Sequence, residues 1–273
     1  MLFVGALIRI QIATVFLFTA LLSAPSARAQ APMTGFAHVA FRVGNLEKSR
    51  EFYGKLGFEQ AFEFSDAGKT TVAFIKINDR QFIELYPRSD DHQLLGLMHV
   101  CYEPTDILAV HDAYAKLDLN PSEVKKARAG NLLFVVHDPE GQLVEYTQYE
   151  PGSLHSLDRG KHLGAQRVSQ SLIGVKVAVR GVAAERSFYT EKLGFASSSS
   201  PGLALQLPGH SGGVLELEPA ATAIEPEITF LVDDAKRTAK ILRRRGLAVQ
   251  TRRGEISVSD PEGVLAVFRQ LRN

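Results

Sequence analysis

Several features that identify common classes of protein are absent from this sequence. Its 273 residues include one cysteine, Cys101, and no tryptophan, so no intrachain disulfide can form and the fold must rest on packing. Neither a glycine-rich phosphate loop nor a serine nucleophile elbow is present. Lysine and arginine number 31 against 30 acidic residues, and so balanced a charge gives no reason to expect binding to nucleic acid or anionic lipid.

The N-terminal segment holds an apolar run, residues 12–22, that follows Arg9 and is too short to span a bilayer comfortably. Small residues at Ala27 and Ala29 meet the preference of signal peptidase. We therefore predict a signal peptide over residues 1–29, cleaved after Ala29, and a secreted or periplasmic protein with no membrane contact after cleavage. An uncleaved membrane anchor is the alternative. Loss of Arg9 and Arg28 would change the formal charge from +1 to −1.

Two motifs occur twice in the chain. The sequence FYGKLGF at residues 52–58 returns as FYTEKLGF at 188–195 with one inserted residue, and Asp-Pro-Glu-Gly stands at both 138–141 and 260–263. Such self-similarity indicates a duplicated domain. The prediction is a first domain over residues 31–150, a polar, glycine-containing linker or flap over 151–169, and a second domain over 170–273.

The first domain divides again into two units that each read as strand, helix and further strands. Residues 36–43 alternate between apolar and other side chains, Asn45 is a helix N-cap, and Gly57 ends that helix. The pattern predicts strands and helices over 36–43, 46–56, 71–77, 81–86, 97–102, 107–117, 131–137 and 143–147. Two such units can curl around a shared cleft.

Four polar residues occupy matching positions in these units, namely His38 and Glu84 in the first and His99 and Glu145 in the second. The separation is 61 residues for both pairs, which predicts that all four side chains converge. Imidazole and carboxylate together suit a borderline divalent ion such as Zn, Ni, Mn, Co or Fe, and the absence of thiolate disfavours a structural zinc site. Taken singly, each histidine reads as core and each glutamate as solvent-exposed.

The order of strand histidine, F-Y-x-x-L-G-F helix, strand glutamate, strand histidine, D-P-x-G turn and strand glutamate resembles the vicinal oxygen chelate superfamily. This superfamily comprises glyoxalases, bleomycin-resistance proteins and extradiol dioxygenases. The resemblance implies an α+β fold of paired βαβββ modules in two tandem domains. It also implies that the ligands of the metal are His38, Glu84, His99 and Glu145, the set that glyoxalase I uses.

The resemblance to glyoxalase I implies an isomerase or lyase acting on a small, oxygen-chelating substrate. Glu145 is then the carboxylate expected to move protons, with Glu84 second. An Fe(II) extradiol dioxygenase using His38, His99 and Glu145 is one alternative, although that class has no carboxylate at position 84. A non-catalytic, bleomycin-resistance-like binding protein is another. Export argues against a glutathione adduct as the substrate, and homodimer formation stays open.

The second domain is predicted not to bind metal in this way. Its counterparts of His38, Glu84, His99 and Glu145 are, in that order, Gly174, Glu216, Thr229 and Val267. One carboxylate alone does not hold a divalent ion at useful affinity.

Other polar and aromatic residues rank below the four. The histidines His137, His155 and His162 are predicted to lie at the surface. Tyr86 and Tyr102 end strands near the proposed site and are candidates to donate to a substrate, although packing is the usual role of aromatic strand residues.

Overall fold

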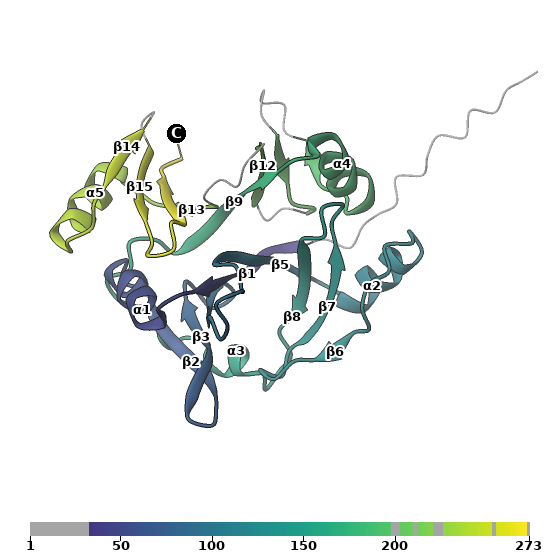
Figure 1. Ribbon diagram of the computed structural model, residues 1–273, viewed down its shortest axis with the longest axis horizontal. Coiled ribbons are helices and arrows are strands. Elements are labelled where there is room, and N and C mark those ends of the chain that lie inside the picture. The colour runs from purple at the N-terminus through teal and green to yellow at the C-terminus, as the bar shows by residue number, and fades with distance from the viewer. Residues whose placement is uncertain (1–32, 198–202, 210–211, 221–225, 253–254, 272–273) are drawn as a thin grey trace, which may run out of the picture.

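The computed structural model describes residues 33–197, 203–209, 212–220, 226–252 and 255–271. The predicted signal peptide, residues 1–29, lies outside this described part. Within it, none of the helices has the length and apolar character needed to cross a membrane. The described chain forms two sheets of eight strands each (Figure 1).

The first sheet contains two βαβββ units, as the sequence predicts. Its strand order is β2-β3-β4-β1-β5-β8-β7-β6, so β4, β1, β5 and β8 are central. The elements are β1 (Met33–Val43), α1 (Leu46–Lys55), β2 (Glu59–Asp66), β3 (Lys69–Lys76), β4 (Phe82–Pro87), β5 (Gly96–Pro104), α2 (Ile107–Ala115), β6 (Lys125–Lys126), β7 (Leu132–His137) and β8 (Leu143–Gln148).

The second sheet repeats this topology in the order β10-β11-β12-β9-β13-β16-β15-β14. A short helix, α3 (Leu154–Leu157), lies between the two sheets in the sequence. The remaining elements are β9 (Ser171–Val179), α4 (Val182–Ser187), η1 (Phe188–Lys192), β10 (Ala196–Ser197), β11 (Ala204–Gln206), β12 (Val214–Pro219), β13 (Glu227–Leu231), α5 (Ala235–Arg244), β14 (Gln250–Arg252), β15 (Glu255–Ser259) and β16 (Leu265–Arg269).

The residue inserted into the second copy of the helical motif is absorbed by a change of helix type. In the first copy, α1 begins after Asn45, whose side chain accepts from the Lys48 amide, and the chain turns at Gly57 with φ 85°. In the second copy, η1 is a π-helix. A π-turn takes in one extra residue without ending the helix. Tyr53 and Tyr189 therefore remain buried at equivalent places.

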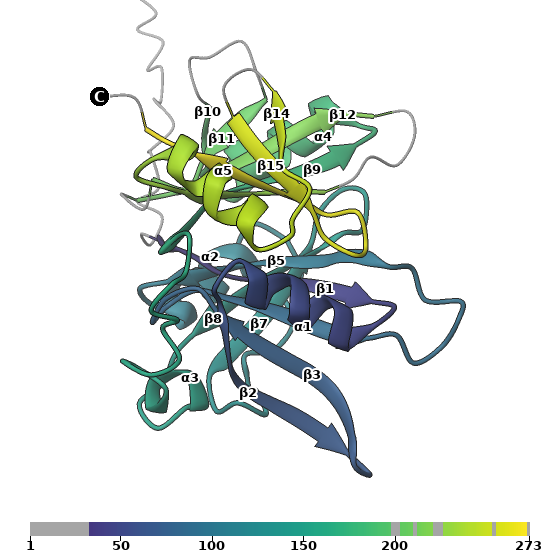
Figure 2. The ribbon, with the colours of Figure 1, turned by 90° about the vertical axis from the view of Figure 1, so that its left-hand side faces the viewer.

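One hydrophobic core joins the two sheets. It includes Val39, Phe41 and Val43, the face of β1 that the alternating pattern predicted to be apolar. Ring pairs cross from one sheet to the other, with centroids 5.4 Å apart for Tyr102 and Phe195 and 5.3 Å apart for Phe58 and Phe230. Figure 2 shows one sheet stacked above the other, with α1 and α5 on the same flank. The opposite face of each sheet is therefore free to form a site.

The repeated Asp-Pro-Glu-Gly turns fasten each domain to the other. In the first turn, Glu140 Oε1 accepts from the backbone amides of Arg180 and Gly181, at 2.6 Å each, just before α4. In the second, Glu262 Oε1 accepts from the amide of Gly44 at 2.8 Å, just before α1. These reciprocal contacts explain why the same turn stands at the same place in both domains.

Candidate metal centre

The four predicted ligand residues share one face of the first sheet, on its four central strands. His38 on β1 is paired with Cys101 on β5, and Cys101 with Glu145 on β8. One step along, Ala40 on β1 is paired with both Glu84 on β4 and His99 on β5. Directly paired residues point to the same face of a sheet, and so do residues two apart on one strand.

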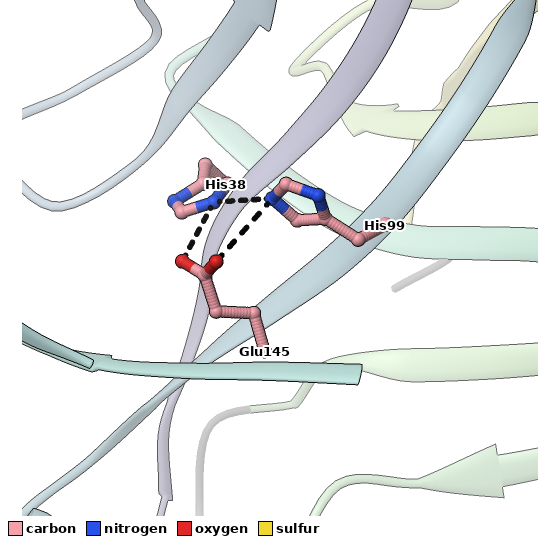
Figure 3. A group of neighbouring side chains, drawn as sticks. All are labelled: His38, His99 and Glu145. Atoms are coloured by element: carbon pink, nitrogen blue, oxygen red, sulfur yellow. Dashed lines mark hydrogen bonds and ion pairs between the residues drawn. The ribbon is translucent and has the colours of Figure 1, made fainter. Parts of the chain in front are cut away.

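Three of these side chains converge on a common point (Figure 3). The Nε2 atoms of His38 and His99 lie 3.0 Å apart. Glu145 Oε1 lies 3.3 Å from the Nε2 atom of His38, and its Oε2 lies 3.8 Å from that of His99. His38 is 3% and His99 8% exposed. The ligand atoms of the three residues all lie within 4.8 Å of one another.

Glu84 lies beside this group and not within it. Its Oε1 is 3.5 Å from Nδ1 of His38, the ring nitrogen that faces away from His99 and Glu145. Its Oε2 accepts a hydrogen bond of 2.7 Å from the Tyr86 hydroxyl. Glu84 is 5% exposed. The structure therefore brings together three of the four predicted ligands and leaves the fourth as a buried neighbouring carboxylate.

The electrostatics of the group favour donors that a metal can use. Burial lowers the pKa of His99 to about 4, which keeps its ring neutral at pH 7. Burial also opposes the charged form of His38, but Glu84 and Glu145 outweigh it and raise the pKa of His38 overall. Burial raises the pKa of Glu84, whereas the hydrogen bond to His38 and the charge of that imidazole outweigh burial at Glu145 and lower its pKa.

The donor chemistry fits a divalent ion of the borderline group. Two imidazole nitrogens and one ionised carboxylate are the ligand types that zinc, manganese, iron, cobalt and nickel accept in proteins. The two Nε2 atoms, 3.0 Å apart, can share one proton, and a divalent ion that displaced this proton would be bound by both. His38, His99 and Glu145 could therefore hold a metal ion, with Glu84 and Tyr86 next to them.

The surroundings of the group include one residue whose environment the sequence prediction missed. His155 on α3 was predicted to lie at the surface, but it is 3% exposed and packs on the rings of this face of the sheet. Ser153 caps α3 by accepting from the Ser156 amide, and this N-cap signal could have indicated an ordered segment. His137 and His162 are exposed, as predicted, and His162 contacts Asp158.

The two tyrosines proposed as substrate donors have different locations. Tyr86 lies in the site, on Glu84. Tyr102 points to the other side of the sheet, into the core shared with the second domain, where its ring contacts Phe195. The suggestion that Tyr102 contacts a substrate was therefore wrong.

The second sheet carries a different set of residues at the equivalent positions. Its register places Gly174 opposite Val214 and pairs Lys176 with both Glu216 and Glu227. Thr229 is paired with Val267 in the same way that Cys101 is paired with Glu145, so Thr229 is the counterpart of Cys101. Glu227, two residues earlier, is therefore the counterpart of His99. That part of the sequence alignment was wrong by two residues, whereas the pairings agree with it for Gly174, Glu216 and Val267.

The eight-stranded sheet of paired βαβββ modules carries two imidazoles and a carboxylate on its central strands, which are the donor types of a metal-binding site. The family model of the Glyoxalase/Bleomycin resistance protein/Dioxygenase superfamily matches residues 35–146. The first domain of this chain belongs to that superfamily. No curated protein matches the sequence significantly.

Solved structures of two kinds are similar to the whole described fold. The Mn(II)-bound glyoxalase from Novosphingobium aromaticivorans has a TM-score of 0.67 and 17% identity, over 88% of this chain and 83% of the other. The 2,3-dioxygenase LapB from Pseudomonas sp. KL28 has a TM-score of 0.66 and 15% identity, over 90% and 94%. Homoprotocatechuate 2,3-dioxygenase from Arthrobacter globiformis has a TM-score of 0.66 and 16% identity, over 90% and 83%. At these identities the likeness establishes the fold.

Proposed function

We propose that the protein is an exported, metal-dependent isomerase or lyase of the glyoxalase type. His38, His99 and Glu145 hold the ion, and Glu84 is the carboxylate that moves a proton. The observation that carries this assignment is the place of Glu84, a buried carboxylate next to the three converging ligands and outside their group. It refines the expectation from sequence, in which Glu145 came first as the proton carrier.

The substrate in this proposal is a small molecule with two neighbouring oxygens. A divalent ion at the three ligands would polarise a carbonyl and so acidify the adjacent C–H bond. The Tyr86 hydroxyl donates to Oε2 of Glu84, and Nδ1 of His38 lies 3.5 Å from Oε1. Oε1 has a second lone pair, which would accept the proton from carbon and return it at the neighbouring atom. A buried carboxylate suits this role because desolvation makes it a stronger base than one in water.

A ring-cleaving dioxygenase is the second candidate, because the three converging residues favour it. Two histidines and one carboxylate with open positions form the ligand set of non-haem Fe(II) oxygenases. Among the similar structures are 2,3-dioxygenases and an extradiol ring-cleaving dioxygenase. In that reaction, His38, His99 and Glu145 would hold the iron, and Glu84 would be neither a ligand nor a proton carrier. A non-catalytic binding protein, the third alternative, needs no ion, so metal analysis separates it from both enzymes.

The cellular location belongs to the proposal as well. Residues 1–29 are proposed to direct export, which would separate the enzyme from most glutathione adducts and point to another oxygen-chelating substrate. N-terminal sequencing of the protein isolated from its native compartment is expected to begin at Gln30. An N-terminus at Met1 would contradict export by cleavage.

Substitution of the two carboxylates tests the assignment of roles. Glu84→Gln should retain the ion but lower turnover of methylglyoxal hemithioacetals, assayed with a panel of small thiols, by about 10²- to 10⁴-fold, the usual contribution of a general base. Glu145→Gln should lose the ion. The matched control is Glu216→Gln, at the position of Glu84 in the second sheet, which should change neither.

Two results would count against the isomerase. Normal turnover by Glu84→Gln would remove the proposed base. Oxygen uptake with catechol after anaerobic loading with Fe(II), together with no hemithioacetal turnover by the wild type, would replace the isomerase with the dioxygenase.

A further inference from the structure

His155 is a buried histidine whose ring nitrogens have no hydrogen-bond partner in the described part of the chain. It is 3% exposed, and neither Nδ1 nor Nε2 makes a hydrogen bond to any residue that the structure describes. Burying a polar group without a partner destabilises the folded state. A phenylalanine or leucine would fill the same space without this penalty, so packing alone does not account for an imidazole here.

The ring of His155 sits in an enclosure of aromatic side chains. It stacks on Tyr149, with centroids 4.5 Å apart and planes at 22°. Phe82, Phe62 and Phe74 meet it edge-on at 4.8, 5.0 and 5.5 Å. Rings packed this closely exclude water from the imidazole.

This enclosure adjoins the metal centre. Phe82 is the residue on β4 directly opposite His38, and Phe74 is the residue on β3 directly opposite Glu84. Paired residues share a face, so His155 lies over the face that carries the ligands. Burial, helped by the nearby charge of His38, lowers the pKa of His155 to about 3. The ring is therefore neutral at pH 7 and offers one donor and one acceptor.

The helix that carries His155 is fixed in place. Lys76 is fully buried, and its Nζ donates to the backbone oxygen and to Oδ2 of Asp158, the latter at 2.8 Å. The Leu154 amide donates to the Ala129 carbonyl at 2.8 Å. Because α3 is held at both ends, the imidazole is positioned before any ligand arrives. A preorganised donor contributes more to binding than a mobile one.

We infer that His155 makes a direct hydrogen bond to the small molecule held at the metal centre. The ligand class is a compact, flat molecule that chelates through two neighbouring oxygens and presents a further polar atom towards α3. The inference rests on the metal site of the proposed function but not on the reaction. It assigns residues 151–162, between the two sheets in the sequence, to the binding site.

The test uses zinc-loaded protein and 4-nitrocatechol, a coloured, flat chelator, with affinity measured by absorbance. His155→Phe keeps the ring and removes both nitrogens, and it should weaken binding about three- to tenfold, the contribution of one hydrogen bond. His155→Gln restores a donor and an acceptor and should recover part of the affinity. Leu157→Ala, on the exposed side of the same helix, is the control and should bind like the wild type.

Two further measurements distinguish a ligand contact from a structural role. Zinc content should be equal in all variants, and metal-free His155→Phe should be at least as stable to urea as the wild type, because it loses two unpartnered polar atoms. Equal affinity of His155→Phe and wild type would overturn the inference, as would a loss of stability with unchanged affinity. Failure of the wild type to retain zinc would instead overturn the metal site, and this inference with it.

Discussion

The free faces of the two sheets share a topology and differ in what neutralises their carboxylates. On the first sheet, Glu84 and Glu145 contact His38, and within the described chain neither pairs with a lysine or arginine. On the second, Lys176 Nζ lies 3.0 Å from Glu227 and 3.5 Å from Glu216. The first sheet therefore offers carboxylates and imidazoles to an ion, whereas on the second sheet Lys176 already neutralises the carboxylates.

The second face is therefore a site whose charge is already balanced. Lys176 stands at the position of Ala40, between the counterparts of Glu84 and His99. Arg269 reinforces it, with NH2 3.7 Å from Glu216 Oε1. A Cβ atom at Gly174 would lie 3.2 Å from Cβ of Thr229, so the place of His38 is also crowded. The two sheets share a topology, whereas charge and space disfavour a metal site of this kind on the second one.

The largest effect is expected from removing a ligand at equivalent positions of the two faces. His99→Ala should lower metal affinity by more than about 100-fold, beyond the loss typical of a residue that only orients a ligand. Glu227→Ala, its matched control, should leave the metal content unchanged. Metal analysis after gel filtration, with circular dichroism to check the fold, measures both. Equal metal loss in the two variants would contradict the assignment of the metal site to the first sheet alone.

Lys76 on the first sheet is buried, whereas Lys176 on the second is half-buried, so removing their charges should lower the unfolding free energy by different amounts. Lys76→Met leaves Asp158 buried without its cation and should cost about 3 kcal/mol of unfolding free energy, the lower end for a broken buried pair, because His162 still contacts Asp158. Lys176→Met breaks a partly exposed pair and should cost about 1 kcal/mol or less. Urea unfolding of the metal-free variants gives both values, and similar losses would contradict the difference in burial.

Acid is expected to lower the metal affinity of the first sheet. Because Glu84 and Glu145 raise the pKa of His38, protons begin to compete with the metal at a higher pH than at an ordinary histidine. Metal affinity is therefore expected to be highest above this pKa and to fall as the pH drops through it. The fall is up to about tenfold per pH unit for each proton that binds. Titration with Zn(II) between pH 8 and 5.5 measures this, and a flat profile would argue against imidazole ligands.

The smallest effect concerns how the first helix of each domain begins. Asn45 caps α1 through its side chain, whereas Gly181 precedes α4 with no side-chain cap. Asn45→Ala should cost about 1 kcal/mol. Gly181→Ala should change the unfolding free energy by less, because a Cβ there meets nothing closer than 3.5 Å. Urea unfolding of the two variants checks this, and a larger loss for Gly181→Ala would contradict it.

Much of the fold and the convergence of three of the four predicted ligand residues could be predicted from the sequence. Alternation along β1 indicated which face His38 occupies, and equal separations indicated that His99 and Glu145 would meet it. The position of Glu84 beside the group could not be predicted, because strand spacing determines the face of a side chain and not its torsion angles. Hydrogen bonding to Tyr86 decides it instead.

The errors have physical causes as well. Glu227 was missed because the connection between the two strands is shorter in the second domain. Glu84 and His99 are 15 residues apart, whereas Glu216 and Glu227 are 11 apart, so counting residues did not follow the pairing. His155 was predicted to be exposed because its segment has no repeated counterpart. Its burial arises from tertiary contacts, such as the Lys76–Asp158 pair, that leave no local pattern.

The most direct test of a metal centre confined to the first domain is the metal-to-protein ratio of the mature wild type, measured after gentle purification and after reloading with Zn, Mn, Ni, Co or Fe(II). The account predicts about one ion per chain, absent from His99→Ala and retained in Glu227→Ala. A ratio near zero in the reloaded wild type would contradict it, as would a ratio that survives His99→Ala.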